Sequence, residues 1–171
     1  MCRIVSLTGK GQRASIAAMN TLTIRPVTPA DFDQWLPLWE GYNEFYGRSG
    51  ETRLDPMITE ITWARFFSAG EPVHALVAEA DGQLLGLAHY LFHRSTTMIA
   101  NTCYLQDLFT IPQARGQGVG RALIEAVADA ARTAGSPRVY WHTHETNVTA
   151  RRLYDAVAKD TGFIVCRVDL P

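Results

Sequence analysis

Three glycines crowd the start of a helix-forming stretch, QARGQGVGRALI, at residues 113–124. Glycine loses more conformational freedom on folding than any other residue, so Gly116, Gly118 and Gly120 need a physical reason. Between a strand and a helix, glycines let the backbone approach a ligand, and the first helical amides stay free to bind an anion. The stretch therefore predicts either a nest for a phosphate or pyrophosphate, or a tight turn that packs the helix on a sheet without a ligand.

The spacing of these glycines disfavours two common nucleotide loops. A dinucleotide-binding loop needs G-x-G-x-x-G after the first strand of its unit, with an acid about 20 residues later. Here the pattern is G-x-G-x-G, it follows the fourth expected strand, and residue 138 is Arg. A Walker loop ends in Gly-Lys-Ser/Thr, which this stretch lacks. A dinucleotide-binding protein is therefore disfavoured.

A third pattern fits the loop and two other stretches. Residues 113–118 match Q/R-x-x-G-x-G/A and so resemble the coenzyme A loop of the GNAT superfamily of N-acetyltransferases. YLQDLFTIP at 104–112 resembles the fourth strand of that family, and NVTARRLY at 147–154 is similar to its N-x-x-A-x-x-L-Y motif. The chain looks closest to the branch likened to histone and polyamine acetyltransferases, whose members end in LYDKVAxxxGF.

This resemblance implies an enzyme that moves an acetyl group from acetyl-CoA directly to a primary amine, in a small molecule or a protein lysine, and needs no metal. The loop amides would hold the pyrophosphate, and the pantetheine arm would pair with the fourth strand. Arg115 and Arg121 would add contacts to phosphate or stay solvated. The implied cofactor-binding residues are Leu108, Phe109, Thr110, Arg115, Gly116, Gly118, Val119, Gly120, Arg121 and Asn147, the last of which also caps its helix. The alternative is a CoA-binding regulatory module without turnover.

Two side chains are the catalytic candidates that the resemblance implies. Tyr154 occupies the position of the proton donor to the departing thiolate, two turns after Asn147, although it could also be a packed aromatic. An alkylammonium has a pKa near 10.4 and must lose a proton before it attacks, so Asp107 is the candidate base or water relay. Asp107 could instead only orient substrate or a water, or accept a hydrogen bond at the strand edge. The branch often places an acid before this Asp, but here Gln106 stands there, which argues against polyamine substrates.

The acceptor site is expected on the first two helices and their loop. LWEGYNEFYGR at 38–48 contains the candidate substrate residues Trp39, Tyr42 and Tyr46, together with Glu40, Asn43 and Arg48. Aromatic rings beside an acid suit a cationic amine, although the same rings also lie at core spacing.

The histidines are interpreted as structural. His142 and His144 form H-x-H on an expected strand and would line or pack one face, because no third ligand with metal spacing appears. His89 and His93 are expected at the surface or partly packed.

Hydrophobic periodicity gives the elements that must position these residues. Expected strands cover 21–27, the two arms of a hairpin at 73–93 around Asp81-Gly82, 101–112, 138–145 and 163–168; expected helices cover 28–47, 56–70, 118–135 and 147–162. This order predicts an α/β (α+β) fold with a mixed central sheet and helices on both faces. The resemblance implies a sheet splayed between strands 4 and 5, with about four flanking helices.

The amino-acid composition limits the classes of protein to which the chain can belong. The chain has 171 residues, 47% of them hydrophobic, and a formal net charge of -1, which argues against a nucleic-acid partner. No apolar run approaches the roughly 20 residues that span a bilayer, so no membrane partner is expected. Cys2, Cys103 and Cys166 form no close pair, which fits a reducing, cytoplasmic setting, and the last two are expected to be buried.

The domain prediction is a single GNAT-like domain at 19–171. Residues 1–18 are interpreted as a loose N-terminal extension that need not belong to the native protein, because Met19 directly precedes the first expected strand. A homodimer across the last strands is expected.

Overall fold

The described structure, a computed structural model, covers residues 21–170, so the predicted extension at 1–18 lies outside it. The strands are β1 (Thr23–Pro26), β2 (Val73–Ala80), β3 (Gln83–His93), β4 (Thr102–Thr110) and β5 (Val139–Tyr140). The helices are α1 (Phe32–Phe45), α2 (Pro56–Arg65), α3 (Val119–Thr133) and α4 (Val148–Val157). Short 3-10 turns occupy Pro29–Asp31, Gly50–Thr52 and Pro112–Ala114. Within this range, no helix is both long and apolar enough to span a bilayer.

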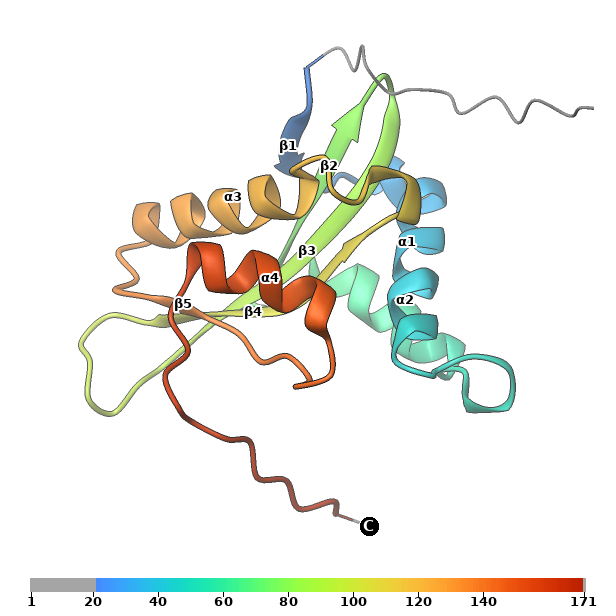
Figure 1. Cartoon of the computed structure of the whole chain (residues 1–171). Helices are drawn as coiled ribbons and strands as arrows, with labels where there is room; N and C mark the ends of the chain where they lie inside the picture. The colour runs from blue at the N-terminus through green and yellow to red at the C-terminus, as the bar shows by residue number, and fades with distance from the viewer. Residues whose placement is uncertain (1–20, 171) are drawn as a thin grey trace, which may run out of the picture.

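The strands form one mixed sheet in chain order (Figure 1). β1 to β4 pair antiparallel, and β5 runs parallel to β4. β4 and β5 pair only at Cys103 with Val139 and Tyr104 with Tyr140, so the remaining length of β4 has no strand on that side within the described residues. The predicted α/β class and the splay between strands 4 and 5 are confirmed.

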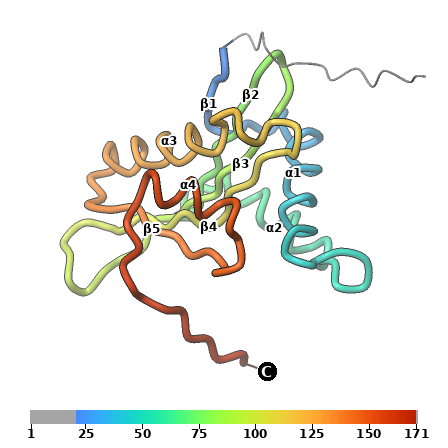
Figure 2. The backbone as a smooth tube through the Cα atoms, in the orientation of Figure 1, coloured from blue at the N-terminus to red at the C-terminus, as the bar shows by residue number. Residues whose placement is uncertain are grey.

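The helices cover the two faces of the sheet (Figures 1 and 2). α1 and α2 pack on one face, around the fully buried indole of Trp35 and the β2 and β3 residues Val77 and Leu87. α3 lies on the other face, where its apolar stripe meets Ala88 and Leu105, and α4 packs beside it. Alternate residues of β2 and β3 therefore enter two separate cores, because successive side chains of a strand point to opposite faces.

The predicted hairpin is confirmed. Asp81 and Gly82 both have positive φ, 51° and 73°, as a two-residue turn between antiparallel strands requires.

The end of the chain differs from the prediction. Residues 158–170 carry no helix or strand, so the expected strand at 163–168 is wrong, and Cys166 is exposed rather than buried. Cys103 is buried as expected. Residues of high strand propensity form a strand only where a neighbour pairs with them, and β5 has only two residues. The homodimer predicted across these strands stays a prediction.

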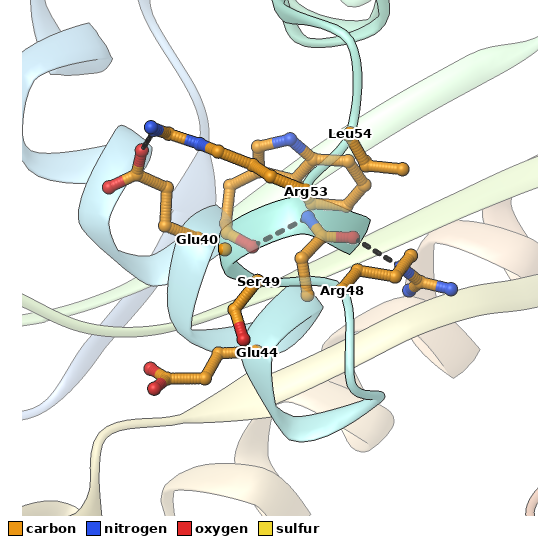
Figure 3. A pocket seen from close by; sticks show the side chains of 9 residues that line it. Glu40, Glu44, Arg48, Ser49, Arg53 and Leu54 are labelled. Atoms are coloured by element: carbon orange, nitrogen blue, oxygen red, sulfur yellow. Dashed lines mark hydrogen bonds and ion pairs between the residues drawn. The ribbon is translucent and has the colours of Figure 1, made fainter.

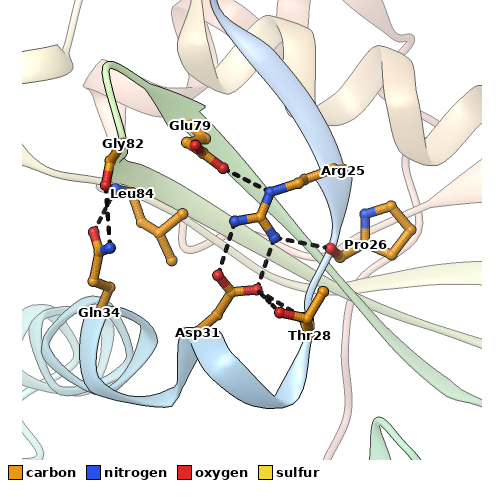
Figure 4. Close-up of polar contacts among 8 residues, drawn as sticks. All are labelled: Arg25, Pro26, Thr28, Asp31, Gln34, Glu79, Gly82 and Leu84. Atoms are coloured by element: carbon orange, nitrogen blue, oxygen red, sulfur yellow. Dashed lines mark hydrogen bonds and ion pairs between the residues drawn. The ribbon is translucent and has the colours of Figure 1, made fainter.

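A buried ion pair fixes the entry to α1 (Figure 4). Asp31 accepts two hydrogen bonds from Arg25 at 2.7 and 2.8 Å, and further bonds from the backbone N–H and hydroxyl of Thr28. Arg25 also donates to Glu79 of β2 at 2.6 Å. The Arg25 guanidinium therefore holds the pKa of Asp31 well below its usual range.

Replacing Asp31 with Asn should lower the free energy of unfolding by about 2 kcal/mol near pH 7, because a buried, charge-assisted network loses its charge. The pKa of Asp31 is depressed in the fold, so its contribution is complete above the unfolded value near 3.9 and is lost as pH falls toward the folded value. Urea unfolding should therefore show the largest difference from wild type above about pH 5 and a shrinking one below pH 4. Asp33→Asn, which removes an exposed carboxylate two residues away, is the control. A pH-independent difference would contradict the charge assignment.

Candidate active site

A bulge in β4 turns Asp107 toward α1. β3 pairs His89 with Asp107 but Tyr90 with Leu105, which leaves Gln106 as an extra residue in β4. Before the bulge, Leu105 points into the core under α3; after it, Phe109 packs in the core under α1. A one-residue insertion shifts every later side chain to the opposite face. Without it, Asp107 would point under α3 and away from the predicted acceptor residues.

The imidazole ring of His89 contacts the Asp107 carboxylate. Its Nδ1 lies 3.0 Å from Oδ2 of Asp107, and the indole N–H of Trp35 donates to its Nε2 at 3.0 Å. An indole N–H can only donate, so Nε2 accepts and the proton of the neutral ring sits on Nδ1, where it is donated to Asp107. The ring is 2% exposed, so the expectation of a surface or partly packed His89 is wrong.

Aromatic side chains of α1 and of Tyr46, which directly follows it, lie near His89 and Asp107. Tyr42 is buried, and burial followed by the charge of Asp107 raises its pKa well above 10. The same two causes raise the pKa of Tyr46, and the Arg48 guanidinium opposes them at both rings. Trp39 stacks on Tyr42 with ring centroids 5.7 Å apart. The structure thus brings the three predicted acceptor residues and Asp107 together.

Tyr154 lies across the open edge of β4 from these rings. Its ring meets Trp141 at 5.3 Å, edge to face. Burial, then the neighbouring Tyr46, raises the pKa of Tyr154 to about 12. Tyr46 therefore lies close enough to both predicted catalytic side chains for charge interactions, with Asp107 on β4 and with Tyr154 on α4.

The glycine loop has the geometry of an anion site. Gly116 and Gly118 have φ of 75° and 85°, a left-handed conformation that favours glycine, and nothing lies within 4 Å of an added Cβ at either. Gly118 is the residue before α3, and the first helical hydrogen bond runs from Ala122 N–H to its carbonyl. Among the described residues, the backbone amides of 116–121 have no protein acceptor.

The third glycine serves packing. A Cβ on Gly120 would lie 3.3 Å from Leu153 of α4 and 3.9 Å from Thr110 of β4, so the start of α3 can lie close to both. Val119 is buried beside it. Arg115 is exposed and donates to the carbonyl of Thr110 at 3.3 Å.

The remaining predicted cofactor residues lie along the splay. Leu108, Phe109 and Thr110 are half-buried on the unpaired part of β4. Asn147 caps α4 as expected, its Oδ1 accepting from Ala150 N–H at 3.3 Å. Arg121 forms a loose pair with Glu125 at 3.9 Å.

Two hollows flank α1. One of about 350 Å³ lies between α1 and the end of β4, with Gly41, Phe109 and Arg115 in its wall. The other, of about 290 Å³, lies beside the loop after α1, with Asn43 and Arg48 in its wall (Figure 3). Neither wall includes Asp107 or Tyr154.

His93, His142 and His144 make polar contacts with neighbouring side chains. β5 ends at Tyr140, so His142 and His144 lie outside a strand, and the predicted one-sided H-x-H arrangement is wrong. The Tyr104 hydroxyl lies 3.2 Å from Nδ1 of His142, and His93 lies 2.9 Å from the Tyr140 hydroxyl. Residues 21–170 contain no cluster of three or more His, Cys, Asp or Glu side chains suited to a metal.

Residues 35–158 match the family model of the acetyltransferase (GNAT) family, so the chain belongs to this family.

Named relatives agree with that assignment. The D-amino-acid N-acetyltransferase HPA3 of Saccharomyces cerevisiae is 34% identical over 146 residues, which cover 84% of this chain and 88% of the relative. The thialysine N-epsilon-acetyltransferase of Caenorhabditis elegans is 25% identical over 156 residues, 88% of this chain and 94% of the relative. The aminoglycoside N-acetyltransferase AAC(6')-Iy in complex with CoA has the same fold, with TM-score 0.70 at 18% identity, covering 87% of this chain and 95% of that one.

The hydrogen bonds of His89 predict its tautomer. Nitrogen-15 NMR of ring-labelled protein should show the neutral ring of His89 protonated on Nδ1 and not on Nε2, because Trp35 occupies Nε2 as a donor. The exposed ring of His144 is the internal control for the opposite tautomer, because the backbone N–H of Thr146 donates to its Nδ1 at 3.3 Å and so favours a proton on Nε2. A proton on Nε2 of neutral His89 would show that Trp35 does not bind the ring.

Proposed function

We propose that this chain transfers the acetyl group of acetyl-CoA to a primary amine of a small molecule. The observation that carries the proposal is the placement of Asp107 by the β4 bulge, on the acceptor face and next to the unpaired edge of the same strand. A carboxylate and an open strand edge at one point let an amine and an extended thioester meet there. The names of the relatives, which specify D-amino acids, thialysine and aminoglycosides, support small-molecule amines over a protein lysine.

The residues present fit the parts of acetyl-CoA. The unpartnered amides at 116–121, at the start of α3, would bind the pyrophosphate with help from the helix dipole. The exposed Arg115 is placed to add a charge-assisted contact. The free edge at 108–110 would pair with the amide groups of the pantetheine arm. Bound there, the cosubstrate supplies a thioester carbonyl for attack.

The proton balance of the reaction gives a role to each of the two ionisable residues, Asp107 and Tyr154. The amine arrives as an ammonium, and Asp107 attracts it and takes one proton, directly or through a water. The free nitrogen then attacks the thioester carbon, so that a C–N bond forms and the C–S bond breaks. Tyr154 keeps its proton at neutral pH, because its pKa is raised to about 12, and donates to the departing thiolate. The second proton lost by nitrogen restores Tyr154, and the one on Asp107 goes to solvent.

His89 acts on this chemistry through Asp107. Its Nδ1–H bond fixes one oxygen of the Asp107 carboxylate. His89 is therefore a positioning residue, held in turn by Trp35 from α1. A cytoplasmic location and a homodimer belong to the proposal as predictions.

Tyr154→Phe should leave CoA affinity close to wild type and lower turnover about a hundredfold or more, because the ring remains and the proton donor is lost. Release of the CoA thiol measures turnover, and thermal shift with CoA measures binding. Tyr90→Phe, in a buried tyrosine of β3, is the matched control and should keep activity. An unchanged rate in Tyr154→Phe would refute its role, while CoA binding without turnover in wild type would favour the regulatory module.

Gly118→Ala should weaken CoA binding about tenfold or more, since a side chain at φ 85° strains the loop by about 1–2 kcal/mol and moves its amides. Gly82→Ala is the control: Gly82 has φ 73° and equally open surroundings, but lies in the distant hairpin turn. Both changes should lower the melting temperature by a similar amount. Titration calorimetry with CoA should separate them, and equal affinities would contradict an amide nest at this loop.

A further inference from the structure

Arg48 lies just after α1 and is held in one orientation by that helix. Its backbone N–H donates to the carbonyl of Asn43 at 2.9 Å, and its Nε donates to Asn43 Oδ1 at 2.8 Å. Asn43 is 5% exposed, and its Nδ2 donates to the carbonyl of Trp39 at 2.8 Å. Figure 3 shows this relay, with the Arg48 side chain directed away from Glu44. A guanidinium fixed in this way loses little conformational freedom when it binds a ligand.

The Arg48 guanidinium also lies over the acceptor rings. Its central carbon is 5.7 Å from the Tyr42 ring centroid and 5.5 Å from that of Tyr46. These two rings are the ones on which the Asp107 charge acts. Charges of opposite sign, those of Asp107 and Arg48, therefore act on both acceptor rings.

Arg48 differs from the arginines that close ion pairs. Arg25 binds Asp31, Arg53 binds Glu40, and Arg65 lies 3.7 Å from Glu71. Among the described residues, no carboxylate lies within ion-pair distance of Arg48, and its two terminal nitrogens have no protein acceptor. A planar guanidinium whose two terminal nitrogens are both available can bind a carboxylate through two parallel hydrogen bonds.

We propose that Arg48 binds a carboxylate of the acceptor, so that the acceptor is an amino acid whose ammonium meets Asp107. This inference rests on the proposed acetyl transfer and narrows its substrate class. Arg48 is a specificity-determining residue, because an amine without a carboxylate brings no partner for its charge and a polycation is repelled by it.

The test compares acceptors that differ only in the carboxylate: alanine with alaninamide, and lysine with 1,5-diaminopentane, the chiral compounds in both enantiomers. Wild type should have kcat/KM about tenfold or more higher for the amino acids, mainly through a lower KM, since a charge-assisted bidentate contact is lost in their analogues. Arg48→Gln should lower kcat/KM for amino acids by a similar factor and change kcat/KM for alaninamide by less than about twofold. It should raise kcat/KM for 1,5-diaminopentane, whose second positive charge Arg48 repels. Arg48→Lys, which keeps the charge without the fork, should fall between them.

Arg53→Gln is the matched control, because it removes a cation from the same loop that Glu40 already neutralises, and the preference should persist. A preference that survives in Arg48→Gln, or a wild-type preference for carboxylate-free amines, would overturn the inference while acetyl transfer stands. Calorimetry of alanine and alaninamide binding to the CoA-loaded protein gives a readout without turnover. If wild type acetylates no amine, the proposed function fails, and selective alanine binding that requires Arg48 would still uphold the carboxylate site.

Discussion

β4 pairs with β3 along its length except at the bulge residue Gln106, but with β5 at only two positions. The other features of the site depend on this difference. Buried backbone N–H and C=O groups without partners cost free energy, so folded chains seldom leave a central strand half paired. Here the unpaired length ends at the glycine loop, where the amides of 116–121 also lack protein acceptors. An extended ligand with an anionic end would bind both sets of groups at once.

The bulge at Gln106 adds the second requirement, a charge on the acceptor face. It places the Asp107 carboxylate among aromatic rings, where an isolated charge would be unfavourable. The neutral His89 ring donates to one oxygen, and Trp35 completes that chain from the helix above. The same aromatic cluster thus stabilises the fold and maintains the charge, so substitutions at Trp35 are expected to affect both.

Features that depend on interactions between neighbouring residues are predictable from the sequence, whereas features that depend on contacts between distant residues are not. The hairpin at Asp81-Gly82, the Asn147 cap and the glycine loop depend on neighbours a few residues away, and the structure confirms the first two and gives the loop an open amide nest. His89 contacts Trp35, which is 54 residues away in the sequence, and no local sequence pattern predicts that contact. The bulge is likewise a property of the pairing between β3 and β4. The strand expected at 163–168 had the right composition but lacks a strand to pair with.

The neutral residue at 106 is consistent with this electrostatic arrangement. An acid at that position would give the bulge two adjacent carboxylates, a set suited to polycationic acceptors. With Gln106 there, the Asp107 carboxylate and the Arg48 guanidinium, which has no carboxylate within ion-pair distance among the described residues, both act on the rings of Tyr42 and Tyr46. A balanced pair of opposite charges favours a ligand that is itself dipolar, because each end then finds its counterion and neither protein charge is buried alone.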